Sequence, residues 1–500
     1  MAVKYVFTLM LENRSFDHML GYSGITGCDA ISGAQTAVVG VPDGVADAGP
    51  AHYCLTVGPK HDFPDVRDQL ATPSGFVDSY AKEIAAKGSP AGADPQDVMR
   101  CFRSAEQLPV LHQLASEFVV FDHWFASMPG PTWPNRFFVH AASSGGLDHS
   151  PNAIEMALSY RLRAFTFEHG HVFQRLEQHG IHWTVLSGGL VPQCFAMDGM
   201  HEFYFTDHRR SMGGMDAVLD DIGGRDRAYV FIEPSYGDIL NDTYKGGTSQ
   251  HALDDVTRGE WLLKAVYEKL RAHEIWKDCA LLVTWDEHGG FWDHVTPPPA
   301  TPPGDRTTYG PNNKHGFTFD RYGVRVPALL ISPRAQRNQI DHRVHDHSTV
   351  LAMLQELWPD LGGPFTARDG KQVEAHSTPA GLLNNDARDD CPQTLAEPRP
   401  TDCPPDDDSP FTDTGEIFGL PPMRTHTAAE PTATPSDTTA AFAHVAHLID
   451  ANAVQPESQQ QAAADYQASM GSTGALASYL NEVQDRVAEK LQSGQTEHVQ

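Results

Sequence analysis

The decisive stretch of the sequence reads Tyr5-Val6-Phe7-Thr8-Leu9-Met10, followed closely by Glu12-Asn13-Arg14-Ser15-Phe16-Asp17. A short apolar run that is rich in β-branched and aromatic residues is typical of a strand buried on both faces. Five further runs of this kind occur along the chain: Phe118–Phe121, Trp183–Leu186, Tyr229–Ile232, Ala280–Thr284 and Ala328–Ile331. Together the six runs predict a sheet at the centre of the molecule.

Helical patterns lie between these runs. Glu260–His273 and Ser348–Trp358 both repeat apolar residues at the spacing of a helix with one buried face. Strands that alternate with helices predict an α/β fold with a mostly parallel central sheet flanked by helices. We expect this unit to span residues 1–375.

The composition changes after this unit. Residues 376–440 are rich in Pro, Thr and Asp, and they include Asp406-Asp407-Asp408, which indicates a solvated linker. Residues 441–500 form a predicted helical extension, with one helix around Phe442–Ile449 and a longer amphipathic one around 476–491. We expect these helices to dock on the main body or to form a homo-oligomer with a second subunit.

Composition and charge limit the function classes. The chain has 500 residues with 36 Lys+Arg against 65 Asp+Glu, a formal net charge of -29. This balance argues against a nucleic-acid partner and against attraction to anionic membranes. No apolar stretch reaches about 18 residues, so no transmembrane segment is expected.

The N-terminus and the cysteines give indications of the cellular compartment. Glu12 interrupts the first apolar run before an export signal is complete, so the chain as written is expected to be cytoplasmic, or secreted or periplasmic if it is a processed form. The seven cysteines contain no CxxC pair, which argues against a zinc cluster. Cys391 and Cys403 are expected to close a small loop if the compartment is oxidising.

Polar residues follow nearly every predicted strand. Ligands bind at the carboxyl ends of parallel strands, so these positions are the place to look for a site. The residues concerned are Glu12-Asn13, Asp122-His123, Glu233 with Asp238, Asp286-Glu287-His288 and, after a loop beyond Ala328–Ile331, His345-Asp346-His347. This arrangement is hard to explain as a purely structural sheet.

Two acidic pairs, Glu12-Asn13 and Asp286-Glu287, come directly after strands. If they converge, their like charges raise one another's pKa unless a cation neutralises them. Oxygen ligands alone suit Mg²⁺, Ca²⁺ or Mn²⁺, whereas added histidine favours Zn²⁺ or Fe. The alternative is that these residues are helix caps and surface acids.

Thr132 lies in the proline-rich stretch Pro129-Gly130-Pro131-Thr132-Trp133-Pro134. A threonine hydroxyl is a weak nucleophile, and contact with a metal ion is one way to activate it. Asn135 and Arg136 follow within one turn and could bind a phosphate oxygen. The alternative is an ordinary turn.

Several histidines stand in polar contexts, among them His61, His251, His288, His294 and His347. A histidine can protonate a leaving oxygen or donate a hydrogen bond to a phosphoryl group. Any one of them alone is as well explained as a surface or core residue. Their grouping beside the acidic pairs favours a catalytic function.

Three motifs resemble the bacterial phosphoesterase family, which includes phosphatidylcholine-type phospholipases C and acid phosphatases. They are Glu12–Asp17, Pro129–Arg136 and Asp286–Pro298, and the resemblance extends over Gly323–Pro333 and Asp346-His347-Ser348 to cover residues 3–360. It implies an alkaline-phosphatase-like α/β core, so residues 1–375 are expected to be the catalytic domain.

The resemblance also implies site residues. One divalent metal ion would be held by Glu12, Asn13, Thr132, Asp286 and Glu287. Thr132 would be the nucleophile that becomes phosphorylated, and His61, His251 and His288 would line the phosphate pocket. Asn135 and Arg136 remain the predicted substrate-binding residues.

Four functions follow as alternatives. The Pro-Thr-Trp-Pro-Asn-Arg motif is similar to the phospholipase C branch, so we predict a phospholipase C-like hydrolase acting on a phosphate ester, such as a phosphatidylcholine-type lipid. An acid phosphatase acting on monoesters is the second reading. The third is a catalytically silent, metal-stabilised binding protein, and the fourth is a two-metal phosphatase with a second site from Glu233, Asp238 or His347.

Overall fold

The structure is a computed structural model that describes residues 3–31, 49–151, 164–189, 192–383, 386–401, 403, 417 and 426–497. Within these residues, eight strands form one sheet in the order β4-β3-β5-β1-β6-β7-β2-β8. The strands are β1 Tyr5–Leu11, β2 Val119–Phe121, β3 His182–Ser187, β4 Arg209–Ser211, β5 Ala228–Glu233, β6 Cys279–Trp285, β7 Ala328–Ile331 and β8 Gln339–Asp341. All paired strands are parallel except β7, which runs antiparallel to β6 and β2.

The six predicted strands are confirmed, and they include the central strand β1, whose residues are all buried. The strands β4 and β8 were not predicted. Each has only three residues and contains polar side chains, so neither produces an apolar run in the sequence. The two lie at opposite edges of the sheet, where burial on both faces is not required.

The direction of β7 corrects one expectation. His345–Ser348 follow the run Ala328–Ile331 in sequence, after a loop, and were expected with the other polar residues at the carboxyl ends of the strands. Because β7 is antiparallel, its carboxyl end lies at the opposite edge. The chain returns to the ligand-binding edge through β8, which pairs parallel to β2.

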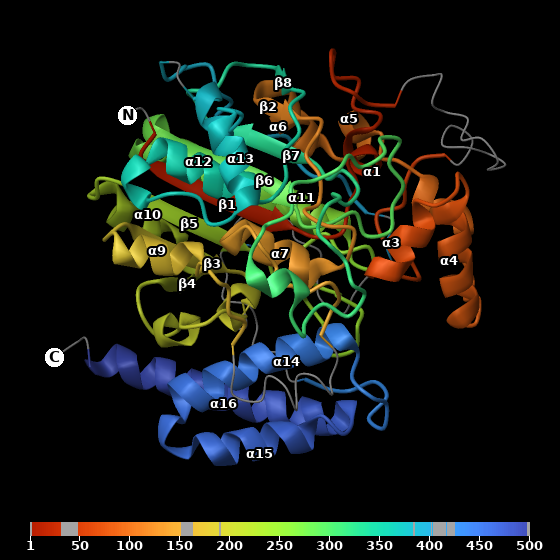
Figure 1. Cartoon of the computed structure of the whole chain (residues 1–500), viewed down its shortest axis with the longest axis vertical. Coiled ribbons are helices and arrows are strands. Elements are labelled where there is room, and N and C mark those ends of the chain that lie inside the picture. Colours follow the sequence, from red (N-terminus) through yellow and green to blue (C-terminus); the bar gives the residue numbers. More distant parts are fainter. Residues whose placement is uncertain are drawn as a thin grey trace.

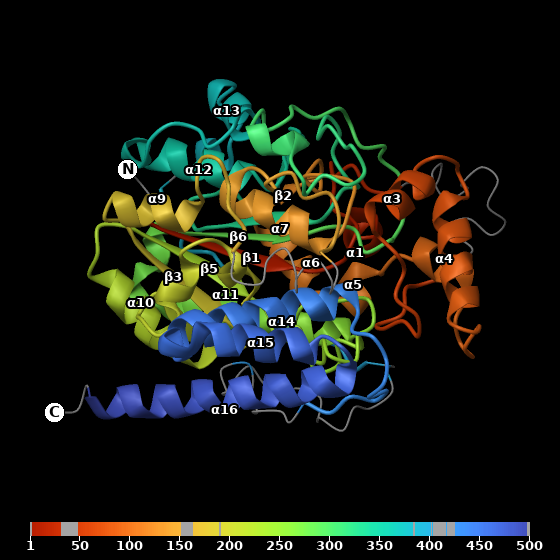
Figure 2. The same cartoon turned by 60° about the horizontal axis from the view of Figure 1, so that its bottom comes forward.

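Helices cover both faces of the sheet. In Figure 2, α7, α9 and α12 lie on one face, and α6, α10 and α11 lie on the other. The helices are α1 Phe16–Leu20, α3 Phe63–Gln69, α4 Gly75–Ala86, α5 Ser104–Gln107, α6 Pro109–Glu117, α7 Thr132–Ala141, α9 Val172–Gln178, α10 Met215–Gly223, α11 Val256–Ala272, α12 Thr349–Leu357, α13 Ala367–Glu374, α14 Asp437–Ile449, α15 Gln459–Ser469 and α16 Thr473–Glu497. The predicted α/β class is therefore confirmed.

The predicted C-terminal helices are α14 and α16, and α15, which was not predicted, lies between them in sequence. Figure 1 shows the three helices gathered on one side of the body. Phe442 of α14 packs against Trp133 and Tyr236, with ring centroids 5.6 and 4.7 Å apart. The helices thus share the hydrophobic core of the α/β unit.

The segment before these helices also contacts the body. Lys264 and Tyr267 of α11 donate hydrogen bonds to the carbonyls of Leu395 and Pro392, both at 2.7 Å. The run Asp406–Asp408 lies outside the described residues, and the limits of the predicted linker stay a prediction. None of the described helices has both the length and the apolar character needed to cross a bilayer.

Candidate active site

The two acidic pairs meet at the carboxyl edge of the sheet because β1 and β6 are neighbours. Leu11 at the end of β1 pairs with Trp285 at the end of β6. Glu12 and Asp286 therefore leave the sheet side by side, and the backbone N–H of Asp286 donates to the Leu11 carbonyl at 3.2 Å. The convergence that the sequence left open is present in the fold.

Local backbone geometry holds Asn13 against the second pair. Its φ of 58° lies in the left-handed region, which Asn tolerates better than most residues. In this conformation the Asn13 backbone N–H donates to Asp286 Oδ1 at 3.0 Å. Gly289 has a φ of 64°, and a Cβ there would lie 2.3 Å from the Asn13 carbonyl oxygen, so only glycine fits.

Three oxygens of these pairs are buried without a hydrogen-bond partner. They are Glu12 Oε2, Asn13 Oδ1 and Glu287 Oε1. The carboxyl of Glu12 is buried, and this burial, together with the charge of Asp286, raises its pKa. Unpartnered buried oxygens are costly, and a bound cation would satisfy all three. The residues present therefore fit the divalent metal ion that the family resemblance implies.

Thr132 is the first residue of α7 and follows Pro131 in extended conformation. Arg136 lies one helical turn later on the same face, where its Nε donates to Asp286 Oδ2 at 3.0 Å and its Nη2 donates to the Leu11 carbonyl at 3.0 Å. The helix is thus fixed to the acidic edge by Arg136. Thr132 keeps 7% of its surface exposed and borders a cavity of about 1130 Å³.

The side chains of Asn135 and Arg136 do not border this cavity. The Asn135 amide donates to the carbonyls of Met128, Gly130 and Pro131 at 3.0–3.2 Å, and its oxygen accepts from the Met128 N–H at 3.0 Å. Asn135 therefore stabilises the turn that precedes Thr132. That Asn135 and Arg136 contact the substrate stays a prediction. Among the described residues, Arg136 Nη1 is buried without a hydrogen-bond partner.

His61 and His251 border the same cavity as Thr132. His61 Nδ1 lies 3.0 Å from the Pro59 carbonyl, and its Nε2 lies 3.6 Å from Glu287 Oε1. Burial would lower the pKa of His61, but the carboxylates of Glu287 and Asp62 outweigh it and raise that pKa. A proton on this ring is therefore stabilised by the acidic edge.

His251 is held by different contacts. Its ring stacks on Tyr244 at 3.4 Å between centroids, and its Nδ1 accepts from the Leu253 N–H at 3.3 Å. Burial and the charges of His61 and Arg14 hold its pKa well below the usual range. The ring is thus neutral, with its N–H on Nε2.

His288 lies behind Glu287, and the cavity does not reach it. Its Nε2 is 2.9 Å from Gln69 Oε1 and its Nδ1 is 3.4 Å from Glu287 Oε2. Sequence reasoning missed Gln69, because a single Gln at the end of a helix matches no motif. Two further contacts were not predicted. Tyr244 stacks on His251, and the Ser249 backbone carbonyl accepts from the Glu12 N–H at 2.9 Å.

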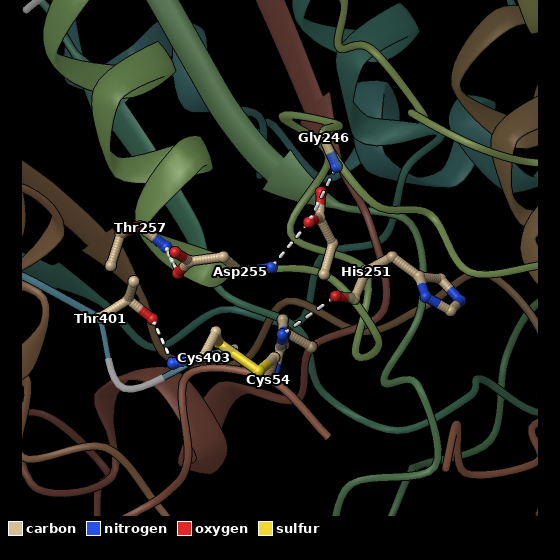
Figure 3. The surroundings of a disulfide bond; sticks show 9 residues. Cys54, Gly246, His251, Asp255, Thr257, Thr401 and Cys403 are labelled. Atoms are coloured by element: carbon tan, nitrogen blue, oxygen red, sulfur yellow. Dashed lines mark hydrogen bonds between the residues drawn. A yellow bond between two sulfur atoms is a disulfide. The ribbon is translucent and has the colours of Figure 1, made fainter. Parts of the chain in front are cut away.

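A disulfide lies at the rim of the cavity, and it corrects the expected cysteine pairing. Cys403 bonds to Cys54, not to Cys391, which is a buried free thiol. The two bonded cysteines are 349 residues apart in sequence, so proximity along the chain was misleading. Figure 3 shows the bond beside His251 and Thr401, whose Oγ1 accepts from the Cys403 N–H at 2.9 Å.

The three residues considered for a second ion have their polar atoms engaged elsewhere. Glu233 accepts from the Tyr236 hydroxyl at 2.9 Å, and Asp238 accepts from Asn241 at 2.8 Å. His347 is fully buried, with Nδ1 3.2 Å from the indole nitrogen of Trp124 and Nε2 2.6 Å from the Asp286 carbonyl. These contacts give the two-metal alternative no support.

Two other groups of acids and histidines have ligand atoms close enough to hold an ion: Asp17, Asp293 and His294, and Asp122, His123 and His342. The first contains its own cation, because the buried guanidinium of Arg325 donates to Asp293 at 2.8 Å and to Asp17 at 3.1 Å. In the second, Asp122 accepts from His123 at 3.0 Å and from His342 at 2.8 Å. Both networks are complete as they stand.

An α/β sheet with acidic pairs, a helix-terminal threonine and histidines at its carboxyl edge defines a phosphoric ester hydrolase. The chain belongs to the phosphoesterase family, whose model matches residues 3–359. It is thus a hydrolase of the phospholipase C-like kind, as the sequence motifs predicted.

Curated relatives agree with this assignment. Non-specific phospholipase C6 of Arabidopsis thaliana is 31% identical over 421 residues, which are 80% of this chain and 76% of the relative. Phospholipase C B of Mycobacterium tuberculosis is 27% identical over 401 residues, which are 71% and 73% of the two chains. Among solved structures, an alkaline phosphatase superfamily protein from Vibrio parahaemolyticus is 14% identical, with a TM-score of 0.31 over 50% of this chain and 60% of that one.

Proposed function

We propose that the protein is a metal-dependent phosphodiesterase of the phospholipase C type that works through a phosphorylated Thr132. The observation that carries this proposal is the set of three unpartnered buried oxygens beside the helix that begins at Thr132. Glu12, Asn13, Thr132, Asp286 and Glu287 would hold one divalent ion. That ion, when bound, would lower the pKa of the threonine hydroxyl and offset the charge of the phosphoryl group.

In this mechanism Thr132 is the nucleophile and His61 transfers the proton. Thr132 Oγ attacks phosphorus, so that a P–O bond to threonine forms while the bond to the leaving oxygen breaks. His61 Nδ1 faces a carbonyl, so Nε2 is the nitrogen that takes the hydroxyl proton and returns it to the leaving oxygen. In the second step water gives its proton to the same nitrogen and attacks phosphorus, the bond between phosphorus and Thr132 Oγ breaks, and the proton passes from Nε2 to that oxygen.

His251 has a different part in this proposal. Because Nδ1 accepts a backbone N–H, the ring presents its own N–H at Nε2 to the cavity. This N–H is suited to donate to a phosphoryl oxygen as negative charge develops there. Arg136 and Asn135 position Thr132 and Asp286 and do not need to contact the substrate.

The size of the cavity favours a phosphodiester over a small monoester. A volume of about 1130 Å³ exceeds the space that a phosphate group alone requires. The relatives named phospholipase C support a phospholipid as the substrate. A monoester remains the second candidate, because the same residues would act on either ester.

The disulfide bears on the compartment. Cys54–Cys403 is of the kind that forms and persists where conditions are oxidising. This supports a secreted or periplasmic protein, the second of the two locations considered from the sequence. Purification from separated compartments would decide between them.

Replacement of the nucleophile tests the proposal. Thr132→Ala should lower turnover of p-nitrophenyl phosphorylcholine at least about 1000-fold, because no other hydroxyl replaces it. Thr243→Ala is the matched control, since Thr243 borders the same cavity but its hydroxyl donates to Asp238. Mass spectrometry after acid quenching should find the phosphorylated group on residue 132 of the wild type only.

The alternatives make different predictions in the same assay. A silent binding protein would bind the ion without turnover, and an acid phosphatase would prefer p-nitrophenyl phosphate to the diester. Chelation of the metal should abolish turnover, and added Mn²⁺ or Zn²⁺ should restore it. Wild-type rates in Thr132→Ala, or full activity after chelation, would contradict this mechanism.

A further inference from the structure

Gln69 is a buried amide that connects the two sides of the candidate site. It is the last residue of α3 and only 1% exposed. Its Nε2 donates to the carbonyl of Lys60 at 2.7 Å, within the loop that carries His61. Its Oε1 lies 2.9 Å from His288 Nε2. One side chain therefore contacts both the His61 loop and the Glu287 loop.

The contacts of Gln69 fix its own orientation. The Lys60 carbonyl can only accept a hydrogen bond, so the amide nitrogen must face it. The amide oxygen then faces His288, and His288 must present an N–H at Nε2. The ring is held in one orientation. With its N–H on Nε2, a neutral ring has only a lone pair at Nδ1, so it packs 3.4 Å from Glu287 Oε2 without donating a hydrogen bond to it.

Glu287 is held on one side only. Its Oε2 accepts from the Gly289 N–H at 2.7 Å and lies 3.4 Å from His288 Nδ1. Its Oε1 has no hydrogen-bond partner and lies 3.6 Å from His61 Nε2. The contacts with Oε2 therefore decide where the free oxygen Oε1 points.

The two loops are also packed directly on one another. Gly290 has a φ of 76°, and a Cβ there would lie 2.7 Å from Pro59 Cβ and 2.8 Å from the Lys60 carbonyl oxygen. This packing does not involve the Gln69 side chain, so it should hold the two loops together when Gln69 is replaced.

We propose that Gln69 is a positioning residue that holds the His288 ring in place behind Glu287 Oε2, which accepts from Gly289, and so keeps Oε1 facing His61 and the ion. This inference rests on the proposed function, since it assigns Glu287 as a ligand. It also gives His288 a new role. In this proposal His288 supports a ligand from behind, whereas the family resemblance implied that it lines the phosphate pocket.

The test removes the amide and keeps its volume. Gln69→Met should lower kcat for p-nitrophenyl phosphorylcholine about 10- to 100-fold, and it should leave KM nearly unchanged, because the substrate contacts remain. Equilibrium dialysis should show Mn²⁺ binding that is about tenfold weaker or more. The affinity measurement is independent of turnover and reports on the ligand geometry.

A double-mutant cycle shows whether Gln69 acts through His288. His288→Ala alone should cause losses at least as large as those of Gln69→Met. The double variant should be no more than about twofold worse than His288→Ala, because the first change has nothing left to act on. Losses that multiply would mean that Gln69 acts by another route, and the proposal would be wrong.

Control variants separate a local effect from general destabilisation. Gln355→Met also removes a buried amide, one that donates to Asp369 at 2.8 Å and lies in α12, away from the cavity. It should keep kcat and Mn²⁺ affinity. If Gln69→Met does not fold, Gln69→Asn keeps the amide but is too short to reach both partners, and it should show the same losses.

The two proposals fail in different ways. An inactive wild type, or an active Thr132→Ala, contradicts the proposed function. Wild-type turnover that needs Thr132, together with normal kcat and Mn²⁺ affinity in Gln69→Met and Gln69→Asn, contradicts only the role of Gln69.

Discussion

Two clusters of buried acids arise from the same two sequence motifs, and they differ in what neutralises them. Glu12 and Asp286 come from the first halves of the motifs and meet at the carboxyl edge of the sheet. Asp17 and Asp293 come from the second halves and meet around Arg325, which contacts both carboxylates. We call these the open cluster and the closed cluster.

The clusters differ in how their buried polar atoms are satisfied. In the closed cluster, Arg325 also donates to the carbonyls of Asp29 and Asp122 at 2.9 and 2.7 Å, and none of its nitrogens is left unpartnered. The open cluster has Arg136, but it leaves three oxygens of its own without partners. Acidic residues alone therefore do not mark a metal site. The open cluster differs because its unpartnered oxygens belong to two pairs of residues that the neighbouring strands β1 and β6 bring side by side.

The largest effect on stability is expected in the closed cluster. Arg325→Met leaves Asp17 and Asp293 buried together without a cation, which should lower the free energy of unfolding by about 3–5 kcal/mol. Urea denaturation measures this loss. Arg321→Met is the control, because Arg321 is exposed and its replacement should change stability by about 0.5 kcal/mol or less. An equal effect of both variants would contradict the proposed difference.

The open cluster should respond in the opposite way. Glu12→Gln removes a buried charge that repels Asp286, so the metal-free protein should be as stable as the wild type or more stable. Turnover and Mn²⁺ affinity should each fall at least about 100-fold, because a ligand is lost. Asp17→Asn makes the same change in the closed cluster and should destabilise the protein by leaving Arg325 underpartnered. If both variants are destabilised equally, the clusters do not differ as described.

A third buried acid, Glu260, extends the comparison, and its expected effect on stability is smaller. Among the described residues no cation pairs with Glu260 of α11, which accepts backbone N–H groups from Val110 at 2.8 Å and Leu111 at 3.0 Å. Burial raises its pKa from 4.5 to about 8. The folded state therefore binds the proton more tightly than the unfolded state, and stability should fall as the pH rises from about 4.5 to about 8.

Glu260→Gln tests this sign. The variant should lose part of the decline in stability between pH 5 and pH 8, by about 1–2 kcal/mol relative to the wild type. Denaturation curves at both pH values measure the decline. The difference between the two proteins isolates Glu260, since the other buried acids titrate in both. An identical decline would show that the folded-state pKa of Glu260 is not raised.

Much of the fold could be predicted from local patterns. Apolar runs located six of the eight described strands, and the helical spacing located α11, α12, α14 and α16. The runs were informative because these strands are buried on both faces, which leaves a continuous apolar signal. The three-residue strands β4 and β8 and the direction of β7 have no such signal, since they depend on pairing with distant strands.

The site was predictable in its residue types but not in its roles. Glu12 and Asp286 were predicted as site residues because each follows a strand within a motif, and the pairing of β1 with β6 brings them side by side. Thr132 was predicted from its motif alone. Nothing in the sequence indicated that Gln69 contacts His288, because these residues are 219 positions apart.

The sequence by itself determined the class of fold and the family, since buried strands and the motifs after them are local properties of the chain. Only the tertiary structure decided which acids are neutralised by Arg325 and which oxygens remain without partners. It also decided that Cys403 bonds to Cys54. These outcomes depend on which distant side chains come within hydrogen-bonding or bonding distance, and no local pattern in the sequence encodes those distances.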